Sequence, residues 1–486
     1  MATMATTARP RAMLLASARV SNELVDVRIE HGVISAIAPA GELPALSEET
    51  TDIGGRWLLP GLWDNHVHFS QWALRSHRLD VAGATSAADT ARMIAEAVTD
   101  RALFVAVGFR DALWTDAPDR TLLDAASSAP VVVVSGDLHS AWLNTPALEL
   151  FGFGAHPTGL IREGDAFGVV SAIDTVPSAV LDGWAGEAAA AAARRGVVGI
   201  VDYDMASNAD TWLRRTSAGT DSLRVEFGIY AEHLDDAITR GFRTGDRLSD
   251  LVTVGNLKVL TDGSLNTRTA YCYDDYPGLS TNPKGLLTVP PVELEHLMRR
   301  AGEAGIQSSV HAIGDHANSL ALDAFERLGT TGRIEHAQLL AQADLARFAH
   351  LGVAASVQPD HAMDDRDVAD RLWTSRTDRA FPLRSLLDAG ATVMFGSDAP
   401  VSRLDPWVAI AAAVGRASGG REPWHPEQRV TPTEAIRASV RTGVRIGERA
   451  DLIAVEADPL ASSPDQLREM PVAATLLAGR FTHQAL

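Results

Sequence analysis

Short apolar runs alternate along most of this chain with longer segments whose apolar residues recur at helical spacing. Eight of the runs are typical of buried strands: one around His66, and the others at residues 199–203, 224–230, 254–260, 306–311, 332–336, 353–358 and 391–396. Helices are expected between most of them, at residues 185–195, 292–304, 318–328, 342–351 and 383–389. This alternation predicts an α/β fold with a parallel sheet, and eight units in sequence predict a (β/α)8 TIM barrel. The other arrangement is a doubly wound open sheet, but no glycine fingerprint of the dinucleotide-binding type follows any strand.

One interval departs from this alternation of strands and helices. Between His68 and Gly199 lie about 130 residues, whereas a crossover between parallel strands needs about a dozen. The interval contains apolar runs of its own, at residues 103–108 and 131–135. We interpret residues 70–185 as a large insertion after the first barrel strand, on the face where barrel active sites lie, so that it covers the site.

Both ends of the chain have the pattern of small β structure. Residues 25–29 alternate between apolar and polar, and residues 450–456 and 472–482 have a similar character. We therefore expect residues 1–58 and 445–486 to form one small discontinuous β-sandwich domain, with the barrel domain spanning residues 59–444.

Side chains that can bind a metal ion lie at or near the ends of several predicted strands. Two of them, His66 and His68, are two residues apart on one strand, so they share a face. Another, Lys258, lies between apolar residues, where an ammonium group is costly to bury. Because strand ends in a barrel form a ring around one mouth, we expect the whole set to converge: His66, His68, Lys258, His311, His336 and Asp398.

Each of these residues has a simpler interpretation when it is taken alone. A single histidine is more often a hydrogen-bonded core residue, an aspartate such as Asp398 can cap a turn, and a lysine such as Lys258 can extend its ammonium group to solvent. Six residues that follow one pattern by accident are improbable, so the set favours a metal centre.

The motifs around these residues closely resemble the metal-dependent amidohydrolase superfamily, particularly its amidohydrolase-3 branch, which includes deformylases of N-substituted formamides. The first carrier of the resemblance is Leu-Pro-Gly-Leu-Trp-Asp-Asn-His-Val-His at residues 59–68. The others cover nearly the whole chain, at residues 138–144, 157–164, 257–264, 310–315, 333–338 and 395–401. The ordered set is specific to the superfamily, although any one motif is not.

The resemblance implies which residues bind metal. His66 and His68 would bind the more buried of two ions together with Asp398, and His311 and His336 would bind the second ion. The expected metal is zinc, although a histidine and carboxylate set also suits other divalent ions.

The resemblance also implies that Lys258 is carboxylated on its amine and bridges the two ions, which removes the problem of a buried ammonium group. In the implied reaction, metal-activated hydroxide attacks the carbonyl of an amide, and Asp398 passes a proton to the leaving nitrogen. The predicted enzyme is therefore a metal-dependent amidohydrolase that cleaves a linear, non-peptide carbon–nitrogen bond, with an N-acyl or N-formyl amide as the expected substrate.

Four residues of the insertion are candidates for contacts with the substrate. His139 would lie on the roof of the site as a polar, catalytic contact, with a histidine in a surface loop as the alternative. Arg162 would meet a substrate carboxylate or else pair with a neighbouring acidic residue. Phe109 and Trp142 would line the pocket, although large aromatic residues are more often plain core. Two departures from the family pattern, at residues 107–111 and at Ala399, prevent the substrate from being carried over.

Composition limits the function classes. The formal net charge of −19 argues against nucleic acid or an anionic membrane as a partner, which leaves a small-molecule substrate, with a homodimer as an open question. A single cysteine, Cys272, is typical of a reducing compartment, and we expect a cytoplasmic protein. Two alternatives remain: a non-catalytic barrel used for binding or assembly, and a mononuclear hydrolase of cyclic amides or esters.

Overall fold

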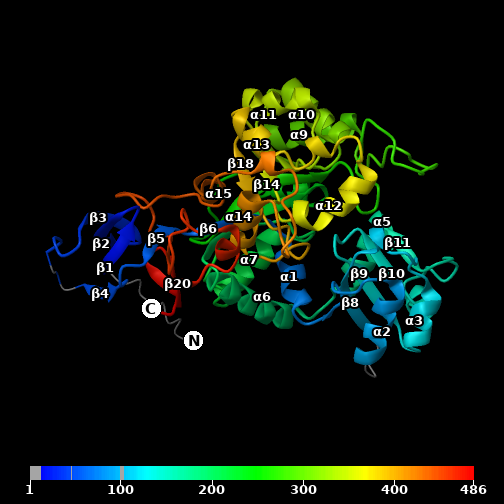
Figure 1. Ribbon diagram of the computed structural model, residues 1–486, viewed down its shortest axis with the longest axis horizontal. Helices are drawn as coiled ribbons and strands as arrows, with labels where there is room; N and C mark the ends of the chain where they lie inside the picture. The colour runs from blue at the N-terminus through cyan, green and yellow to red at the C-terminus, as the bar shows by residue number, and fades with distance from the viewer. Residues whose placement is uncertain (1–11, 45, 47, 99–102) are drawn as a thin grey trace.

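A parallel barrel forms the centre of the molecule in this computed structural model, which describes residues 12–44, 46, 48–98 and 103–486 (Figure 1). Its eight strands pair in chain order, each parallel to the next: β6 (Leu62–Val67), β12 (Val197–Asp202), β13 (Arg224–Tyr230), β14 (Val252–Leu260), β15 (Ser308–Ala312), β16 (Gly332–His336), β17 (Val353–Val357) and β18 (Val393–Phe395). The predicted eight-stranded barrel is confirmed, and each strand lies where the apolar runs predict it.

A seam of hydrogen bonds nearly closes the barrel between β18 and β6. The Asp398 amide donates to the carbonyl oxygen of His66 at 2.7 Å, and Asn65 Nδ2 donates to the carbonyl oxygen of Phe395 at 2.9 Å. The chain at Gly396 approaches so closely that a Cβ atom there would lie 2.7 Å from the His66 backbone nitrogen. Glycine at this position therefore lets the loop that carries Asp398 lie against the strand that carries His66.

Helices surround the barrel and bury the outer faces of its strands. They are α1 (Phe69–Arg75), α6 (Ser178–Ala193), α7 (Asn208–Ser217), α8 (Leu234–Thr239), α9 (Pro291–Glu303), α10 (Asp315–Leu328), α11 (Leu345–Leu351), α12 (His361–Leu372), α13 (Leu383–Asp388), α14 (Pro406–Gly415), α15 (Pro432–Ala438) and α16 (Pro464–Arg468). Helix α10 ends at Gly329, whose φ of 59° turns the chain back toward β16.

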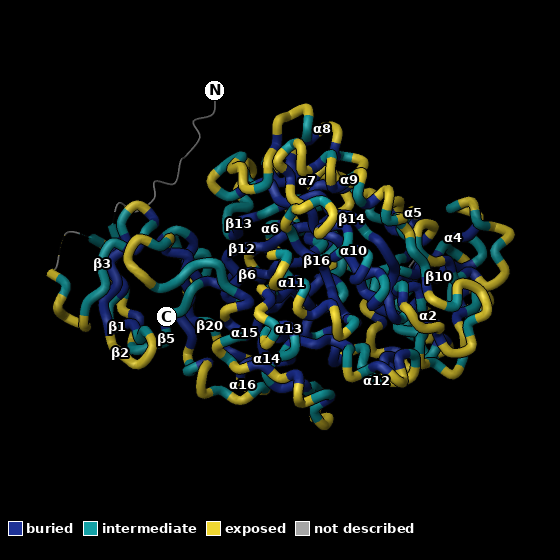
Figure 2. The backbone as a smooth tube through the Cα atoms, turned by 90° about the horizontal axis from the view of Figure 1, so that it is seen from above, coloured by how far each residue is buried: buried dark blue, intermediate teal, exposed yellow. Residues whose placement is uncertain are grey.

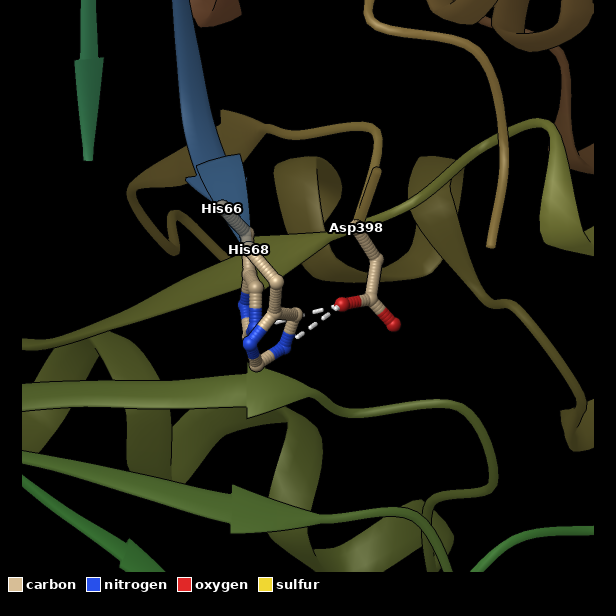
Figure 3. A group of neighbouring side chains, drawn as sticks. All are labelled: His66, His68 and Asp398. Atoms are coloured by element: carbon tan, nitrogen blue, oxygen red, sulfur yellow. Dashed lines mark ion pairs between the residues drawn. The ribbon is translucent and has the colours of Figure 1, made fainter. Parts of the chain in front are cut away.

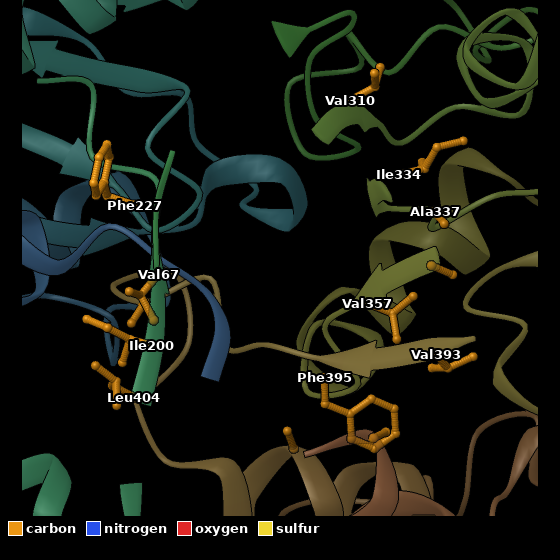
Figure 4. Close-up of a cluster of buried hydrophobic side chains, with 14 of the residues drawn as sticks. Val67, Ile200, Phe227, Val310, Ile334, Ala337, Val357, Val393, Phe395 and Leu404 are labelled. Atoms are coloured by element: carbon orange, nitrogen blue, oxygen red, sulfur yellow. The ribbon is translucent and has the colours of Figure 1, made fainter. Parts of the chain in front are cut away.

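The largest hydrophobic core lies between these helices and the strands. Because both faces of a parallel strand are covered, the strands are buried on both faces, as in β15, where the core residue Val310 alternates with the buried polar residues Ser309 and His311. Figure 4 shows side chains from around the barrel in this core, among them Val67, Ile200, Phe227, Val310, Ile334, Val357 and Phe395. In Figure 2 the strands β6 and β12 have the dark blue of buried residues, and exposed residues lie in loops and on the outer surfaces of helices.

The insertion after β6 folds around a sheet of its own, on the right of Figure 1. Its strands are β7 (Leu79–Asp80), β8 (Phe104–Phe109), β9 (Val131–Ser135), β10 (Ser140–Leu143) and β11 (Leu160–Arg162), in the order β11-β10-β9-β8-β7. Helices α2 (Ala87–Ala97), α3 (Arg120–Ala126), α4 (Thr145–Leu150) and α5 (Glu163–Ile173) belong to the same segment.

Strands from the two ends of the chain form one sheet, on the left of Figure 1. Its order is β21-β20-β19-β5-β1-β2-β3, and β4 also pairs with β1. These strands are β1 (Ala12–Val20), β2 (Glu23–Glu30), β3 (Val33–Pro39), β4 (Glu49–Asp52), β5 (Trp57–Pro60), β19 (Leu452–Val455), β20 (Val472–Leu477) and β21 (Arg480–Gln484). Because β19 pairs directly with β5, the C-terminal strands extend the N-terminal sheet, and the predicted sandwich is not confirmed. The domain boundaries stay a prediction, and residues 1–11 of that prediction lie outside the described residues.

Among the described residues, no single helix has the length and apolar character of a membrane span, and only α5 and α6 taken together, across a 100° bend, meet that test.

Candidate active site

A cavity of about 410 Å³ opens at the carboxyl ends of the barrel strands, beneath the insertion. The insertion and the barrel both contribute to its lining. The insertion contributes Phe109, His139 and Phe167, among others. The barrel contributes all six residues that the sequence singled out as metal-capable: His66, His68, Lys258, His311, His336 and Asp398. Side chains separated by more than 300 residues in sequence therefore share one cavity, as the strand-end argument predicted.

The tightest group in the cavity joins β6 to the loop after β18. Figure 3 shows the imidazole rings of His66 and His68 turned toward the carboxylate of Asp398. The distances from Asp398 Oδ1 are 3.4 Å to His66 Nε2 and 3.3 Å to His68 Nε2. The backbone of Asp398 has a φ of 56°, in the left-handed region, and its amide hydrogen bond to His66 holds it there.

Glu335, at the penultimate position of β16, fixes the orientation of His66. Its Oε2 atom lies 2.8 Å from His66 Nδ1, so the imidazole donates from Nδ1 and keeps a lone pair on Nε2, which faces Asp398. Burial lowers the pKa of His66 to about 4, so the ring is neutral at neutral pH. Burial alone would raise the pKa of Glu335, but His66 and Lys258 lower it to about 2. The pair is therefore a neutral imidazole held by an ionised carboxylate.

The sequence analysis did not find Glu335 because strand alternation would place it on the face opposite His336. In the structure, a φ of 76° at His336 and of 43° at Ala337 ends the regular strand geometry. The side chain of Glu335 shares a face with His311 by regular pairing, and that of His336 consequently joins it at the metal-capable cluster. The adjacent acidic residue in the Arg-Ile-Glu-His segment was the available signal.

Lys258 is 2% exposed and lies inside the same cluster. Its Nζ atom is 3.4 Å from His66 Nε2 and 4.5 Å from the centre of the Tyr203 ring. Burial lowers the pKa of Lys258 to about 8, against the opposing effect of Glu335 and Asp398. A neutral amine is the form that reacts with carbon dioxide, and this environment makes that form accessible near neutral pH.

A second group forms around His336. Its ring centre lies 4.4 Å from that of His311, whose Nε2 atom is 3.4 Å from Asp262 Oδ1. The potential ligand atoms of His336, His361 and Asp398 all lie within 4.8 Å of one another. His361 was not singled out from the sequence, although it follows the seventh barrel strand closely, so the strand-end pattern was the signal that could have found it.

The residues present fit a divalent metal ion. Two buried ring nitrogens, His68 Nδ1 and His336 Nδ1, have no hydrogen-bond partner among the described residues. Burial holds the pKa of His336 well below its usual value, so this ring is neutral. Burial would raise the pKa of Asp398, but the neighbouring histidines hold it well below its usual range. Neutral imidazoles around an ionised carboxylate are the donor set that zinc and similar divalent ions prefer.

One prediction concerns Glu335. We expect Glu335→Gln to weaken zinc affinity by about 10- to 100-fold, because a neutral amide oxygen accepts the hydrogen bond from His66 Nδ1 more weakly than the carboxylate does. Calorimetric titration of the metal-free protein measures this change. Glu434→Gln, which changes a helix-capping carboxylate instead, should keep the wild-type affinity. Equal affinities in the two variants would remove Glu335 from the metal site.

The insertion places His139 on the roof of the cavity. Its Nδ1 atom lies 3.0 Å from Glu163 Oε2, and its ring centre is 6.3 Å from that of His311. Burial alone would lower the pKa of His139, but the hydrogen bond and charge of Glu163 raise it to about 9. His139 is therefore a cation at neutral pH, and Glu163, another residue that the sequence analysis left without a role, stabilises it.

Of the other three predicted substrate contacts, one lines the cavity and two do not. Phe109 lines the cavity. Trp142 is fully buried in the core of the insertion, among residues such as Phe109 and Leu123, and is not part of the cavity lining. The Arg162 side chain is 43% exposed, lies 3.8 Å from Asp111, and is also not part of the lining. Both side chains share a strand face with Ser140, which does line the cavity, so they lie beyond its edge.

Comparisons with known proteins agree on one family. The sequence profile described as "Amidohydrolase family" matches residues 49–483. The putative amidohydrolase YtcJ of Bacillus subtilis is 27% identical over 94% of this chain and 96% of its own. N-substituted formamide deformylase of Arthrobacter pascens is 25% identical over 90% of each chain. Protein LONG AFTER FAR-RED 3 of Arabidopsis thaliana is 27% identical over 81% of this chain and 75% of its own.

Solved structures share the fold. An uncharacterized metal-dependent hydrolase from Pyrococcus horikoshii superimposes with a TM-score of 0.78 at 23% identity, covering 93% of this chain and 99% of its own. N-isopropylammelide isopropylaminohydrolase from Burkholderia multivorans superimposes with a TM-score of 0.55 at 15% identity, covering 97% of each chain.

Proposed function

The chain belongs to the amidohydrolase family and is a hydrolase that acts on carbon–nitrogen bonds; from that premise we propose that it cleaves a linear, non-peptide amide, an N-acyl or N-formyl compound. The observation that carries this proposal is the convergence of His66, His68 and Lys258 on the ionised Asp398, in a cavity large enough for a small molecule. The likeness to a formamide deformylase supports the choice of substrate class.

Two divalent ions, with zinc as the proposed metal, would be held by these side chains. His66, His68 and Asp398 would hold one ion, His311 and His336 would hold the other, and Lys258, carboxylated on its amine, would lie between them. A metal ion held there would supply Lewis acidity, which lowers the pKa of water and polarises a carbonyl group.

The protein's own groups would move the proton. Asp398 is ionised and can accept a proton from water at Oδ1 or Oδ2, then transfer it to the nitrogen that leaves as an amine. His139, as a cation on the roof, would donate a hydrogen bond to the substrate and orient its carbonyl group. The insertion would exclude bulk water, which strengthens both interactions.

The cavity lining between α1 and α6 includes five apolar side chains, beside Ser171, Asp174 and Ser178, and we call this part its apolar side: Leu74, Phe167, Val170, Val176 and Leu181. We place the substituent on the amide nitrogen against this side, because an apolar group gains free energy on leaving water and a charged group would lose it. The proposed substrate is therefore a secondary amide with an apolar amine.

A substrate panel tests the proposal. N-formyl and N-acetyl derivatives of benzylamine, hexylamine and ethanolamine are offered beside a cyclic amide and an ester, and amine or acid release is measured. We expect kcat/KM for the apolar N-substituted formamides to exceed that for the ethanolamine derivative by about tenfold or more. Cleavage of the cyclic amide or the ester alone would overturn the linear-amide proposal, and no cleavage at all would favour a non-catalytic role.

The same proposal includes a cytoplasmic location and a small-molecule partner in place of nucleic acid or a membrane. It is supported by a single, buried cysteine and by the net charge of −19.

A further inference from the structure

We propose that His361 is a catalytic residue whose Nε2–H donates a hydrogen bond to the amide carbonyl oxygen as that oxygen gains negative charge. The inference rests on the proposed function and adds to it a residue that none of the family motifs above contains. His361 is the first residue of α12 and lines the same cavity as His139.

The position of the His361 imidazole supports this assignment. His361 is 5% exposed, and its Nε2 atom is buried without a hydrogen-bond partner among the described residues. The ring lies nearly parallel to that of His336, with ring centres 6.4 Å apart, and its ligand-capable atom lies within 4.8 Å of those of His336 and Asp398. A side chain this close to Asp398 can contact the carbonyl group of a substrate whose proton transfer Asp398 carries out. A buried polar atom without a partner costs about 1–3 kcal/mol, which a bound substrate would recover.

The tautomer of His361 also supports this assignment. Gln338 Nε2 lies 3.3 Å from His361 Nδ1, so the amide donates to Nδ1. A neutral imidazole carries one proton, and with Nδ1 as the acceptor that proton lies on Nε2. His361 therefore presents a donor to the cavity, not a lone pair. The opposite orientation of the Gln338 amide would place the proton on Nδ1 and make Nε2 a metal ligand, an outcome that the experiment below detects.

The His361 donor is also preorganised, because packing and the Gln338 contact hold its ring before substrate binds. A donor that is already fixed near the position of the developing oxyanion needs no rearrangement during the reaction, and removing one such donor lowers kcat by about 100- to 1,000-fold in well-studied hydrolases. His139 orients the substrate from the insertion, whereas His361 belongs to the barrel that carries Asp398. The two histidines thus come from different segments of the chain.

The test compares His361→Leu and His361→Gln with the wild type, on the amide of the panel that is cleaved fastest. We expect the leucine variant to lose about 100-fold or more in kcat with KM changed less than about threefold. The glutamine variant, whose amide N–H can replace the donor, should recover part of that loss. Metal content per chain, measured by elemental analysis, should equal that of the wild type in both variants.

His316→Leu is the matched control. His316 also has a buried ring nitrogen without a hydrogen-bond partner in the part of the chain that the structure describes, but it stacks against Tyr271 and Tyr273 and does not line the cavity. Its kcat should be unchanged.

Each contrary outcome is distinct. Loss of metal from His361→Leu would make His361 a ligand and overturn the assignment, as would an unchanged kcat in that variant. A wild-type protein that cleaves no compound of the panel would overturn the proposed function and this assignment together. An active wild type beside an equally active leucine variant would overturn this assignment alone.

Discussion

Asp398→Asn is expected to lower kcat by about 1,000- to 10,000-fold while leaving the fold intact. The amide group of asparagine cannot accept and transfer a proton as the carboxylate does, and it removes the negative charge that His66 and His68 face at 3.4 and 3.3 Å. Asparagine is the suitable replacement because it tolerates the left-handed backbone conformation of this position better than other residues do. The backbone hydrogen bond to His66 is also kept, so the barrel seam should survive.

The measurement combines turnover of the best panel amide with a thermal melting curve and metal analysis. Asp323→Asn, which changes a half-exposed aspartate paired with Arg347 on the outside of the barrel, should behave as the wild type in all three. A folded Asp398→Asn protein with normal turnover would remove Asp398 as the proton acceptor.

Lys258→Ala should lose at least one metal ion per chain and lower kcat by about 100-fold or more, since even the partners of metal ligands change affinity by 10- to 100-fold. The substitution removes the amine 3.4 Å from His66 Nε2 and leaves space beside Glu335 and Tyr203. A small carboxylate such as acetate or propionate can enter that space and replace the carbamate. We therefore expect partial recovery of metal and activity when such an acid is added at millimolar concentration.

Lys258→Met is the control for this rescue. Methionine fills much of the volume of the lysine stem without offering a nitrogen, so it should lose metal in the same way and should not respond to added carboxylate. Full metal occupancy in Lys258→Ala would argue against a bridging role of Lys258. Equal rescue of both variants would show that the added carboxylate does not act in the space left by the lysine side chain.

The sequence was sufficient to predict the barrel because each of its strands is buried on both faces. Continuous apolar runs such as Val197–Asp202 cannot be a half-exposed strand, and the helices between them have distinct apolar faces. The convergence of metal-capable residues followed from the same geometry, since parallel strands end at one mouth. The terminal sandwich was not confirmed because alternation within a strand indicates one buried face without showing whether a second sheet covers it.

The parts of the site that the sequence did not predict depend on local backbone geometry. His336 joins its neighbour Glu335 at the cluster because the backbone at His336 leaves the regular strand conformation, and such a φ has no signature in the sequence of a non-glycine residue. His361 lies four residues after the end of β17, at the start of α12, and was missed although the strand-end pattern that found Asp398 could have included it. Trp142 and Arg162 were chosen by chemistry alone. They share a face with Ser140, which lines the cavity, but how far the cavity extends along β10 and β11 has no signature in the sequence.

The most direct test of the central claim is the metal content of the protein, purified without chelator and with bicarbonate present. Our account predicts about two divalent ions per chain, bridged by a carboxylated Lys258 and lost together with activity on chelation. About one ion per chain would support a mononuclear centre and remove the bridging role of Lys258. No bound metal, even after reconstitution with zinc, would contradict the account.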